Sequence, residues 1–294
     1  MKVKVILAAL LILTFPTTSL AATKPLIPLT ALAPTVITNF SGGDQVSAIS
    51  LSSTAIYLVG TVENISSNLM TTPSLGGSDG FVLALSPSGS KLWELRLGGS
   101  GDDVANAIAQ DATGNLWIAG ASTNGTAIPA PGLNRINVWE VSSQGALINT
   151  FSRDSNDVSI PTRITAKNSK YILQGITSKA GFQSFAATLD PLAKIGSLNY
   201  SPSALPSPSP TKTAISAVYS WQSYITSGPI KGVLGMTPHQ SIPVLTHSGL
   251  KDKALKGASA IVGNPIDLQY QNGVGLVLLS QGSGTYYVTI IHTK

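Results

Sequence analysis

A short pattern that recurs along the chain constrains its fold more than any other feature. Each copy is a run of apolar and aromatic residues that leads into a glycine, and the copies follow one another at intervals of 53 to 60 residues. The glycines are Gly60, Gly120, Gly175, Gly228 and Gly282. A regular period of this length is the signature of a repeat architecture, in which each copy is one supersecondary unit.

Each copy predicts four short strands. The first copy reads "VSAISL", "AIYLVGTV", "GFVLALS" and "KLWELRL", with turn residues between the runs. Such runs, bounded by Gly, Ser, Asn and Pro, are typical of strands joined in hairpins, and no segment keeps a helical period. The sequence therefore predicts an all-β fold of four-stranded antiparallel blades, with blade bounds 44–97, 103–151, 160–200, 213–247 and 258–292.

The two ends of the repeat region complete one another. The last copy has no fourth strand, whereas residues 35–40 resemble a fourth strand with no blade before it. Pairing these ends would close the string of sheets into a ring, which leaves only short, protected edges. We therefore expect a five-bladed β-propeller over residues 35–294, closed by its N-terminal strand.

The first residues have the pattern of a secretory signal peptide. Lys2 and Lys4 precede an apolar run, and small residues follow up to Ala22. The alternative is an uncleaved anchor. We expect a signal peptide over residues 1–22, a linker over 23–34, and a mature chain without a transmembrane segment that is secreted, extracellular or periplasmic.

Composition excludes disulfide bonds and argues against nucleic-acid binding. The chain has no cysteine, so no disulfide holds the fold. Only 11% of its residues are charged and no basic block occurs, so the electrostatic footprint of a nucleic-acid-binding protein is missing. We expect a monomer without nucleic-acid partners.

The stretch "GGSDGFVLALSPSGSKLWELRLGGSGDDVANAIAQDATGNLWIAGAST", residues 76–123, resembles the seven-bladed β-propeller (SBBP) repeat family of secreted bacterial proteins. The match weakens after Phe151. The resemblance implies a propeller, extracellular or associated with the cell envelope, and it supplies no catalytic motif. This chain departs from the family name because it holds five copies.

Acidic residues recur just before the first strand of a blade. They are Asp44, Asp103 and Asp157, with Asp102 and Asp154 beside two of them. The functional interpretation is a cation or polar-ligand site, with Ca²⁺ as the only cofactor considered. The alternative, which the sequence favours, is that these carboxylates end loops by bonding to their own backbone. Both interpretations place them on the face that carries the longer connections, from second to third strands and between blades, which we name the long-loop face.

Other candidate residues favour structural roles. "DATGN" (111–115) is typical of a hairpin turn, and the four tryptophans, whose alternative is sugar stacking, are expected to pack between blades. The three histidines lie far apart in sequence, and no "GxSxG" nucleophile motif occurs. Asp267 is the only acid on the predicted inner strands.

Two functions are consistent with these features. The first is a non-catalytic exported module that binds a glycan, a peptide or an envelope protein through the long-loop face. The alternative is an enzyme of the five-bladed glycoside hydrolase type, which needs two carboxyl groups roughly 5 to 10 Å apart. Because the inner strands offer one carboxylate, the sequence favours the non-catalytic module.

Overall fold

The computed structural model describes residues 29–31, 33–37, 44–63, 70–123, 132–190, 194–202, 211–215, 219–225, 232–238, 255–256, 264–282 and 284–293. Their strands form five sheets, in which most strands pair antiparallel with a neighbour along the chain, while β1, β2 and β19 join strands remote in sequence. The first sheet contains β3 (Gln45–Leu51), β4 (Ile56–Val62), β5 (Asp79–Leu85) and β6 (Lys91–Leu97); the second contains β7 (Asp103–Gln110), β8 (Leu116–Thr123), β9 (Leu133–Val141) and β10 (Leu147–Asp154). Both have the predicted four strands in the predicted order.

The remaining sheets depart from that regular form. The third contains β11 (Ser159–Lys167), β12 (Lys170–Thr177), β13 (Gln183–Asp190), β14 (Lys194–Ile195) and β15 (Asn199–Ser201); the fourth contains β16 (Thr211–Ile215), β17 (Tyr219–Ile225) and β18 (Gly232–Pro238). The fifth contains β20 (Asn264–Gln271), β21 (Gly275–Gly282) and β22 (Thr285–Thr293), joined by β1 (Leu29–Ala31), β2 (Thr35–Ile37) and β19 (Leu255–Lys256).

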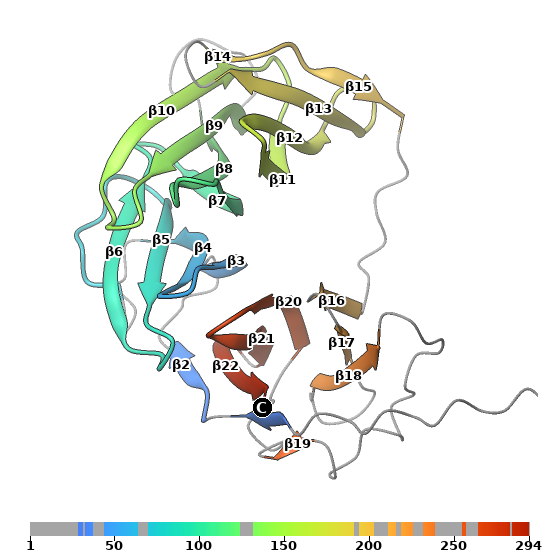
Figure 1. The fold of residues 1–294 in the computed structure, drawn as a ribbon. Coiled ribbons are helices and arrows are strands. Elements are labelled where there is room, and N and C mark those ends of the chain that lie inside the picture. Colours follow the sequence, from blue (N-terminus) through green and yellow to red (C-terminus); the bar gives the residue numbers. More distant parts are fainter. Residues whose placement is uncertain are drawn as a thin grey trace, which may run out of the picture.

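The sheets are arranged radially. Figure 1 shows β3, β7, β11, β16 and β20 turned toward a common centre, while β6 and β10 lie at the outside. The innermost strands contact one another in the order β11, β7, β3, β20 and β16. The all-β prediction is thus confirmed, and this radial arrangement is that of a β-propeller.

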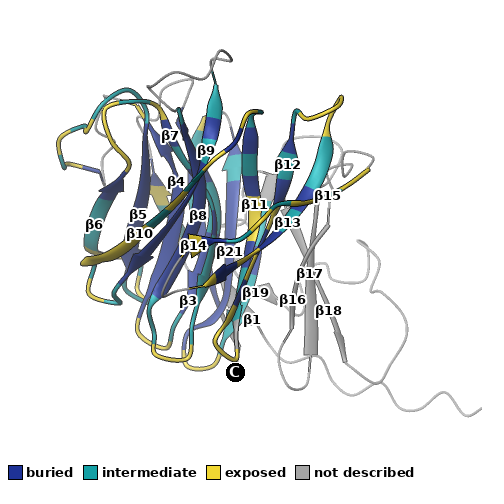
Figure 2. Ribbon diagram, turned by 90° about the horizontal axis from the view of Figure 1, so that it is seen from above, coloured by how far each residue is buried: buried dark blue, intermediate teal, exposed yellow. Residues whose placement is uncertain are grey.

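The core lies between neighbouring sheets. One buried cluster joins the fifth and first sheets, a second joins the first and second, and a third joins the second and third. Strands β4 and β5 are buried at every position because both faces of the first sheet are covered (Figure 2). This explains why their sequences read as continuous apolar runs.

Two predicted strands differ from the observed ones. The fourth strand of the third sheet is split into β14 and β15, which both pair with β13. Between them, Gly196 donates to the Thr188 carbonyl, and glycine and serine at 196 and 197 are weak strand formers. The fourth copy of the repeat predicts strands at 214–219 and 242–247. The first of these is wrong at its end, because Tyr219 begins β17, which pairs with β18. Residues 216–218 and 242–247 lie outside the described residues.

The N-terminal segment joins the fifth sheet. In β2, Val36 pairs with Tyr287 of β22, and β1 pairs with the end of the same strand. Residues 29–31 therefore form a strand within the predicted linker, because the long β22 leaves an edge beyond β2 for them to pair with. Residues 38–40 and the predicted signal peptide lie outside the described part of the chain. Among the described residues, no helix is long and apolar enough to span a membrane.

Candidate functional site: a polar channel and its mouth

Four innermost strands carry a β-bulge at the same place. The pairing of first with second strand shifts register at Ser47 in β3, Asn106 in β7, Thr162 in β11 and Ile266 in β20. Strand β16 pairs with β17 without a shift. A bulge inserts one residue and redirects its side chain, and bulges are over-represented beside active sites. Here all four bulged residues line the space between the innermost strands.

The bulge explains why the repeat contains a glycine. Gly60, Gly120 and Gly175 each lie opposite the residue that precedes the bulge. A Cβ atom at any of them would collide with a carbonyl oxygen of the innermost strand. In the fifth sheet the same place is held by Ser280, which pairs with Pro265, so the sequence assignment of Gly282 as the equivalent glycine is wrong by two residues.

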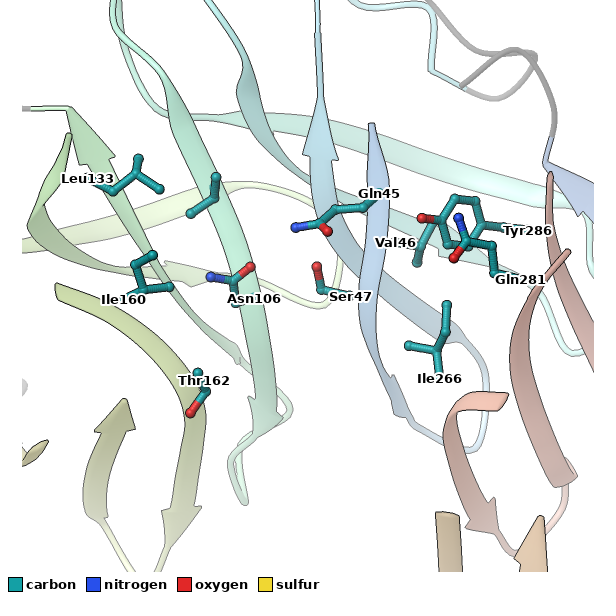
Figure 3. Close-up of a pocket in the computed structure, with 11 residues that line it drawn as sticks. Gln45, Val46, Ser47, Asn106, Leu133, Ile160, Thr162, Ile266, Gln281 and Tyr286 are labelled. Carbon is teal, nitrogen blue, oxygen red and sulfur yellow. The ribbon is translucent and has the colours of Figure 1, made fainter. Parts of the chain in front are cut away.

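A cavity of about 570 Å³ occupies the channel between these strands. Its polar lining includes Gln45, Ser47, Asn106, Thr162 and Gln281 (Figure 3). A second cavity of about 540 Å³ shares Ser47, Asn106 and Thr162 with the first. The two cavities form a continuous channel whose amide and hydroxyl groups both donate and accept hydrogen bonds.

The mouth of the channel lies on the long-loop face. It is a pocket of about 780 Å³ that shares Gln45, Val104 and Leu133 with the channel cavity. Glu63 and Asp102 are the two carboxylate residues that line it. The mouth therefore brings an acid from the end of β4 together with an acid from the start of β7.

Hydrogen bonds fix both carboxylate residues. Asp102 accepts hydrogen bonds from the Ser78 amide at 3.1 Å, and its own amide donates to the Thr123 hydroxyl at 2.9 Å. The Glu63 amide donates to Asp44, and its carbonyl accepts from the Arg96 guanidinium at 3.3 Å.

Arg96 is itself held in place by a buried ion pair. Its Nη1 lies 2.7 Å from Asp79 Oδ2, and both side chains are almost fully inaccessible to solvent. The Arg96 Nε also donates to the Thr72 carbonyl at 2.9 Å. The rim of the mouth is therefore anchored to the core of the first sheet.

Three of the acids predicted from the sequence, Asp44, Asp103 and Asp154, have partners within their own sheet or its loops. Asp44 and Asp103 are buried, and Asp103 accepts hydrogen bonds from Ser122 and from the Gly99 amide. Burial raises the pKa of Asp103, although these two hydrogen bonds partly oppose that effect. Asp154 pairs with Arg135, which lowers the pKa of its carboxyl group. Of the predicted acids, only Asp102 lines the mouth.

Asp157 does not occupy the place that the sequence pattern assigned to it. Counting from the bulges, Ser159 is the equivalent of Asp44 and Asp103, and its hydroxyl bonds to Thr177 at 3.0 Å. The bulge in β11 at Thr162 fixes this register, which local sequence similarity did not show. Within the described residues, no group of three or more His, Cys, Asp or Glu side chains could hold a metal ion.

Asp267, the acid predicted on an inner strand, joins two sheets. Its Oδ2 accepts from the Ile49 amide at 3.1 Å, and its Oδ1 accepts from the Leu268 amide at 2.8 Å. Gln269 donates to the Ile49 carbonyl beside it. Asp267 Oδ2 and the Gln269 amide thus tie β20 to β3, while Oδ1 bonds within β20.

Sequence reasoning missed Glu63 and the ring of bulged residues. Glu63 precedes a long connection, and nothing in its local pattern marks it. The bulged residues had a signal, because Ser47, Asn106 and Thr162 are polar residues inside otherwise apolar runs.

No family model and no curated protein matches this chain. Solved structures with a similar arrangement include the Bacteroides ovatus xyloglucan PUL GH43B, with 14% identity and a TM-score of 0.38 over 92% of this chain and 53% of that one. A xylan β-1,4-xylosidase from Bacillus halodurans has 16% identity and a TM-score of 0.37 over 86% and 42%. An α-L-arabinofuranosidase from Clostridium thermocellum has 9% identity and a TM-score of 0.34 over 69% and 96%.

The chain spans about half the length of the first two of these structures. Two of the three carry the glycoside hydrolase designation GH43 in their names, and the third is named a xylosidase. These solved structures are named as glycoside hydrolases and not as binding modules, which contradicts the sequence-based prediction of a non-catalytic binding or scaffold module. At these identities and TM-scores, the roles of individual residues rest on the geometry of this chain alone.

Proposed function

We propose that the five sheets are the blades of a five-bladed propeller closed by its N-terminal strand. Three contacts support the closure. Strand β2 pairs with β22, the Asp267 and Gln269 side chains bond to Ile49 of β3, and Tyr286 of β22 bonds to the Val46 backbone. Each joins the fifth sheet to the N-terminal part of the chain.

We further propose that the chain hydrolyses glycosidic bonds at the mouth of its channel. The observation that carries this proposal is the placement of Glu63 and Asp102 around one pocket that opens into a polar channel. Glycoside hydrolysis uses a pair of carboxyl groups on either side of the scissile bond. One gives its proton to the leaving oxygen as the C–O bond breaks, and the other activates the water or attacks the sugar carbon itself.

The channel lining fits a carbohydrate. Gln45, Asn106 and Gln281 offer amide donors and acceptors, while Ser47 and Thr162 offer hydroxyl groups. Vicinal sugar hydroxyls form hydrogen bonds with both kinds of partner. Because these groups are neutral, the lining suits an uncharged glycan. The Lys2 and Lys4 charges before an apolar run support export of the enzyme, which would give it access to extracellular polysaccharide.

Activity measurements on the purified chain test this proposal. We expect release of reducing sugar from at least one substrate in a panel of xylan, arabinan, galactan and xyloglucan. The substitutions Glu63→Gln and Asp102→Asn each remove a carboxylate while keeping the shape of the side chain. Each is expected to lower kcat about 100-fold or more.

Asp154→Asn is the matched control. Asp154 is an exposed acid near the same face that does not line the mouth, so its loss should leave kcat unchanged. The proposal is wrong if the wild-type chain hydrolyses no member of the panel, or if both mouth variants retain wild-type kcat.

A further inference from the structure

The second sheet differs from its neighbours at one interior position. On the third strand, the residue opposite the repeat glycine or its equivalent is Phe81 in the first sheet, Phe185 in the third and Tyr287 in the fifth. In the second sheet this residue is Asn137. The ring next to Gly120 comes instead from Trp139, two residues farther along β9. An amide thus stands where the first, third and fifth sheets have an aromatic residue.

A directed chain of hydrogen bonds starts at this amide. Ser152 donates to Asn137 Oδ1 at 2.7 Å, Asn137 Nδ2 donates to Ser122, and Ser122 donates to Asp103. Asp103, Ser122 and Asn137 are each more than nine-tenths buried. Burying so many polar groups is costly unless every group is satisfied, and the first, third and fifth sheets have an aromatic side chain at the equivalent position.

A cavity of about 450 Å³ lies against this chain of hydrogen bonds. Its lining includes the four residues of the chain, the exposed Thr150, and the backbone of the Gly98–Gly101 loop. The cavity shares Thr123 with the mouth of the channel, but neither Glu63 nor Asp102 lines it. The amide of Asn137 makes the wall of this cavity polar where a phenyl ring would make it apolar.

The charges around the cavity favour a neutral ligand. Arg135 is already paired with Asp154, with 2.6 Å between Nε and Oδ1. Asp103 is the only carboxylate residue in the lining, and one carboxylate is far fewer than the ligands that a hard cation requires. An anion would be repelled by Asp103. The groups left to a ligand are hydroxyl lone pairs, one amide N–H of Asn137 and backbone groups.

We propose that this cavity is a second binding site, specific for a neutral polyol the size of one sugar ring. Its volume falls within the range of small-molecule pockets, and its lining alternates donors with acceptors as vicinal hydroxyls require. The site is distinct from the proposed catalytic mouth. It would bind a free sugar or a side branch of a polysaccharide whether or not the mouth is active.

Binding measurements with D-xylose, D-galactose and myo-inositol test this proposal. Titration calorimetry and saturation-transfer NMR should detect binding of at least one of them below about 50 mM. Asn137→Phe introduces the kind of residue that the first, third and fifth sheets have at this position and replaces a polar wall of the cavity with a larger apolar one, so it should weaken binding about tenfold or more. Glu63→Gln, in the mouth, should bind the same polyol as tightly as the wild type.

Ser152→Ala provides a second variant if Asn137→Phe does not fold. It removes one hydroxyl at the exposed end of the chain and should weaken binding about threefold to tenfold. The proposal is overturned if the wild type binds none of the three polyols, or if the folded Asn137→Phe protein or the Ser152→Ala protein binds as tightly as the wild type. Binding that is lost in Glu63→Gln would place the ligand in the mouth and also overturn it.

Discussion

At the scale of single residues, polar side chains such as Asp111 form hydrogen bonds that hold turns and neighbouring sheets together. Asp111 begins the predicted turn at 111–115, and its carboxylate accepts from the Thr113 and Asn115 amides and from Trp117 Nε1 at 2.8 Å. The Tyr171 hydroxyl, from the next sheet, reaches the same carboxylate at 3.3 Å. The predicted hairpin turn is confirmed, but its role in joining two sheets was not foreseen.

The Asp111 carboxylate should make stability depend on pH. Burial by itself would raise its pKa, but the hydrogen bonds from Thr113, Trp117 and Asn115 outweigh burial, so its pKa in the folded chain is lowered. Its contribution to stability is therefore present above its pKa in the unfolded chain, about 3.9, and is lost as pH falls through the lower folded value. Asp111→Ala should lower the free energy of unfolding by about 1–3 kcal/mol at pH 7.

Urea unfolding at pH 7 and near pH 3 measures this difference. The difference in the free energy of unfolding between wild type and Asp111→Ala should be smaller at the lower pH. A gap that is constant or wider in acid would show that the charged form of Asp111 does not carry the stabilisation.

At the scale of elements, the pairing of the first two strands sets the shape of each blade. The residue inserted in the first strand lines the channel, and the carbonyl two residues before it lies against the repeat glycine of the second strand. Only a glycine accepts that approach in three of the sheets. The third strand then decides what covers the glycine, which is an aromatic ring in the first and third sheets and Trp139 in the second.

Gly120→Ala should disrupt the bulge of the second sheet. Its Cβ would collide with the Val104 carbonyl and approach the Trp139 ring to 2.9 Å, so the free energy of unfolding should fall by about 3 kcal/mol or more. Gly99→Ala is the matched control, because a Cβ there meets nothing within 4 Å. The control should change stability by less than about 0.5 kcal/mol. Equal effects of the two substitutions in thermal unfolding would contradict this account of the repeat glycine.

At the scale of the whole molecule, the proposed closure depends on the pairing of β2 with β22, whose residues are remote in sequence. Strand β2 contributes three residues, and Ile37 packs in the cluster shared by the fifth and first sheets. The described contacts run from the third sheet through the second, first and fifth to the fourth. The pairing of β2 with β22, which we call the seam of the proposed ring, thus lies in the fifth sheet, which packs against both the first and the fourth sheets.

A disulfide across this seam tests the closure. Val36 and Tyr287 are direct partners, so their Cβ atoms lie on the same side of the sheet, and the natural chain has no cysteine to interfere. The double variant Val36→Cys/Tyr287→Cys should oxidise to an intramolecular disulfide. A disulfide typically stabilises a fold by about 2–4 kcal/mol, so Tm should be higher than in the reduced form.

Electrophoresis without reductant and thermal unfolding measure these effects, with Val36→Cys alone as the control. Free thiols that persist under oxidising conditions in the folded double variant would contradict the pairing of β2 with β22.

The parts of the fold that depend on local pattern could be predicted from the sequence. Alternating and continuous apolar runs predicted the strands of the first two sheets, and Gly, Ser and Asp predicted their turns. The spacing of the repeat glycines predicted how many units follow one another. The same information predicted a strand near residue 36 as the partner of the C-terminal strands, and β2 pairs with β22.

The candidate site could not be predicted in this way. A bulge shifts the register by one residue and can be recognised only from the pairing with the partner strand. For this reason the sequence pattern assigned Asp157 to the wrong position and did not show that Ser47 and the other bulged residues line the channel. The mouth joins Glu63 to Asp102, which come from neighbouring sheets. The sequence by itself determined which segments are strands, because strand formation follows from the nearest residues along the chain. Only the tertiary structure decided which polar side chains share a cavity, because that depends on packing between strands that are remote in sequence.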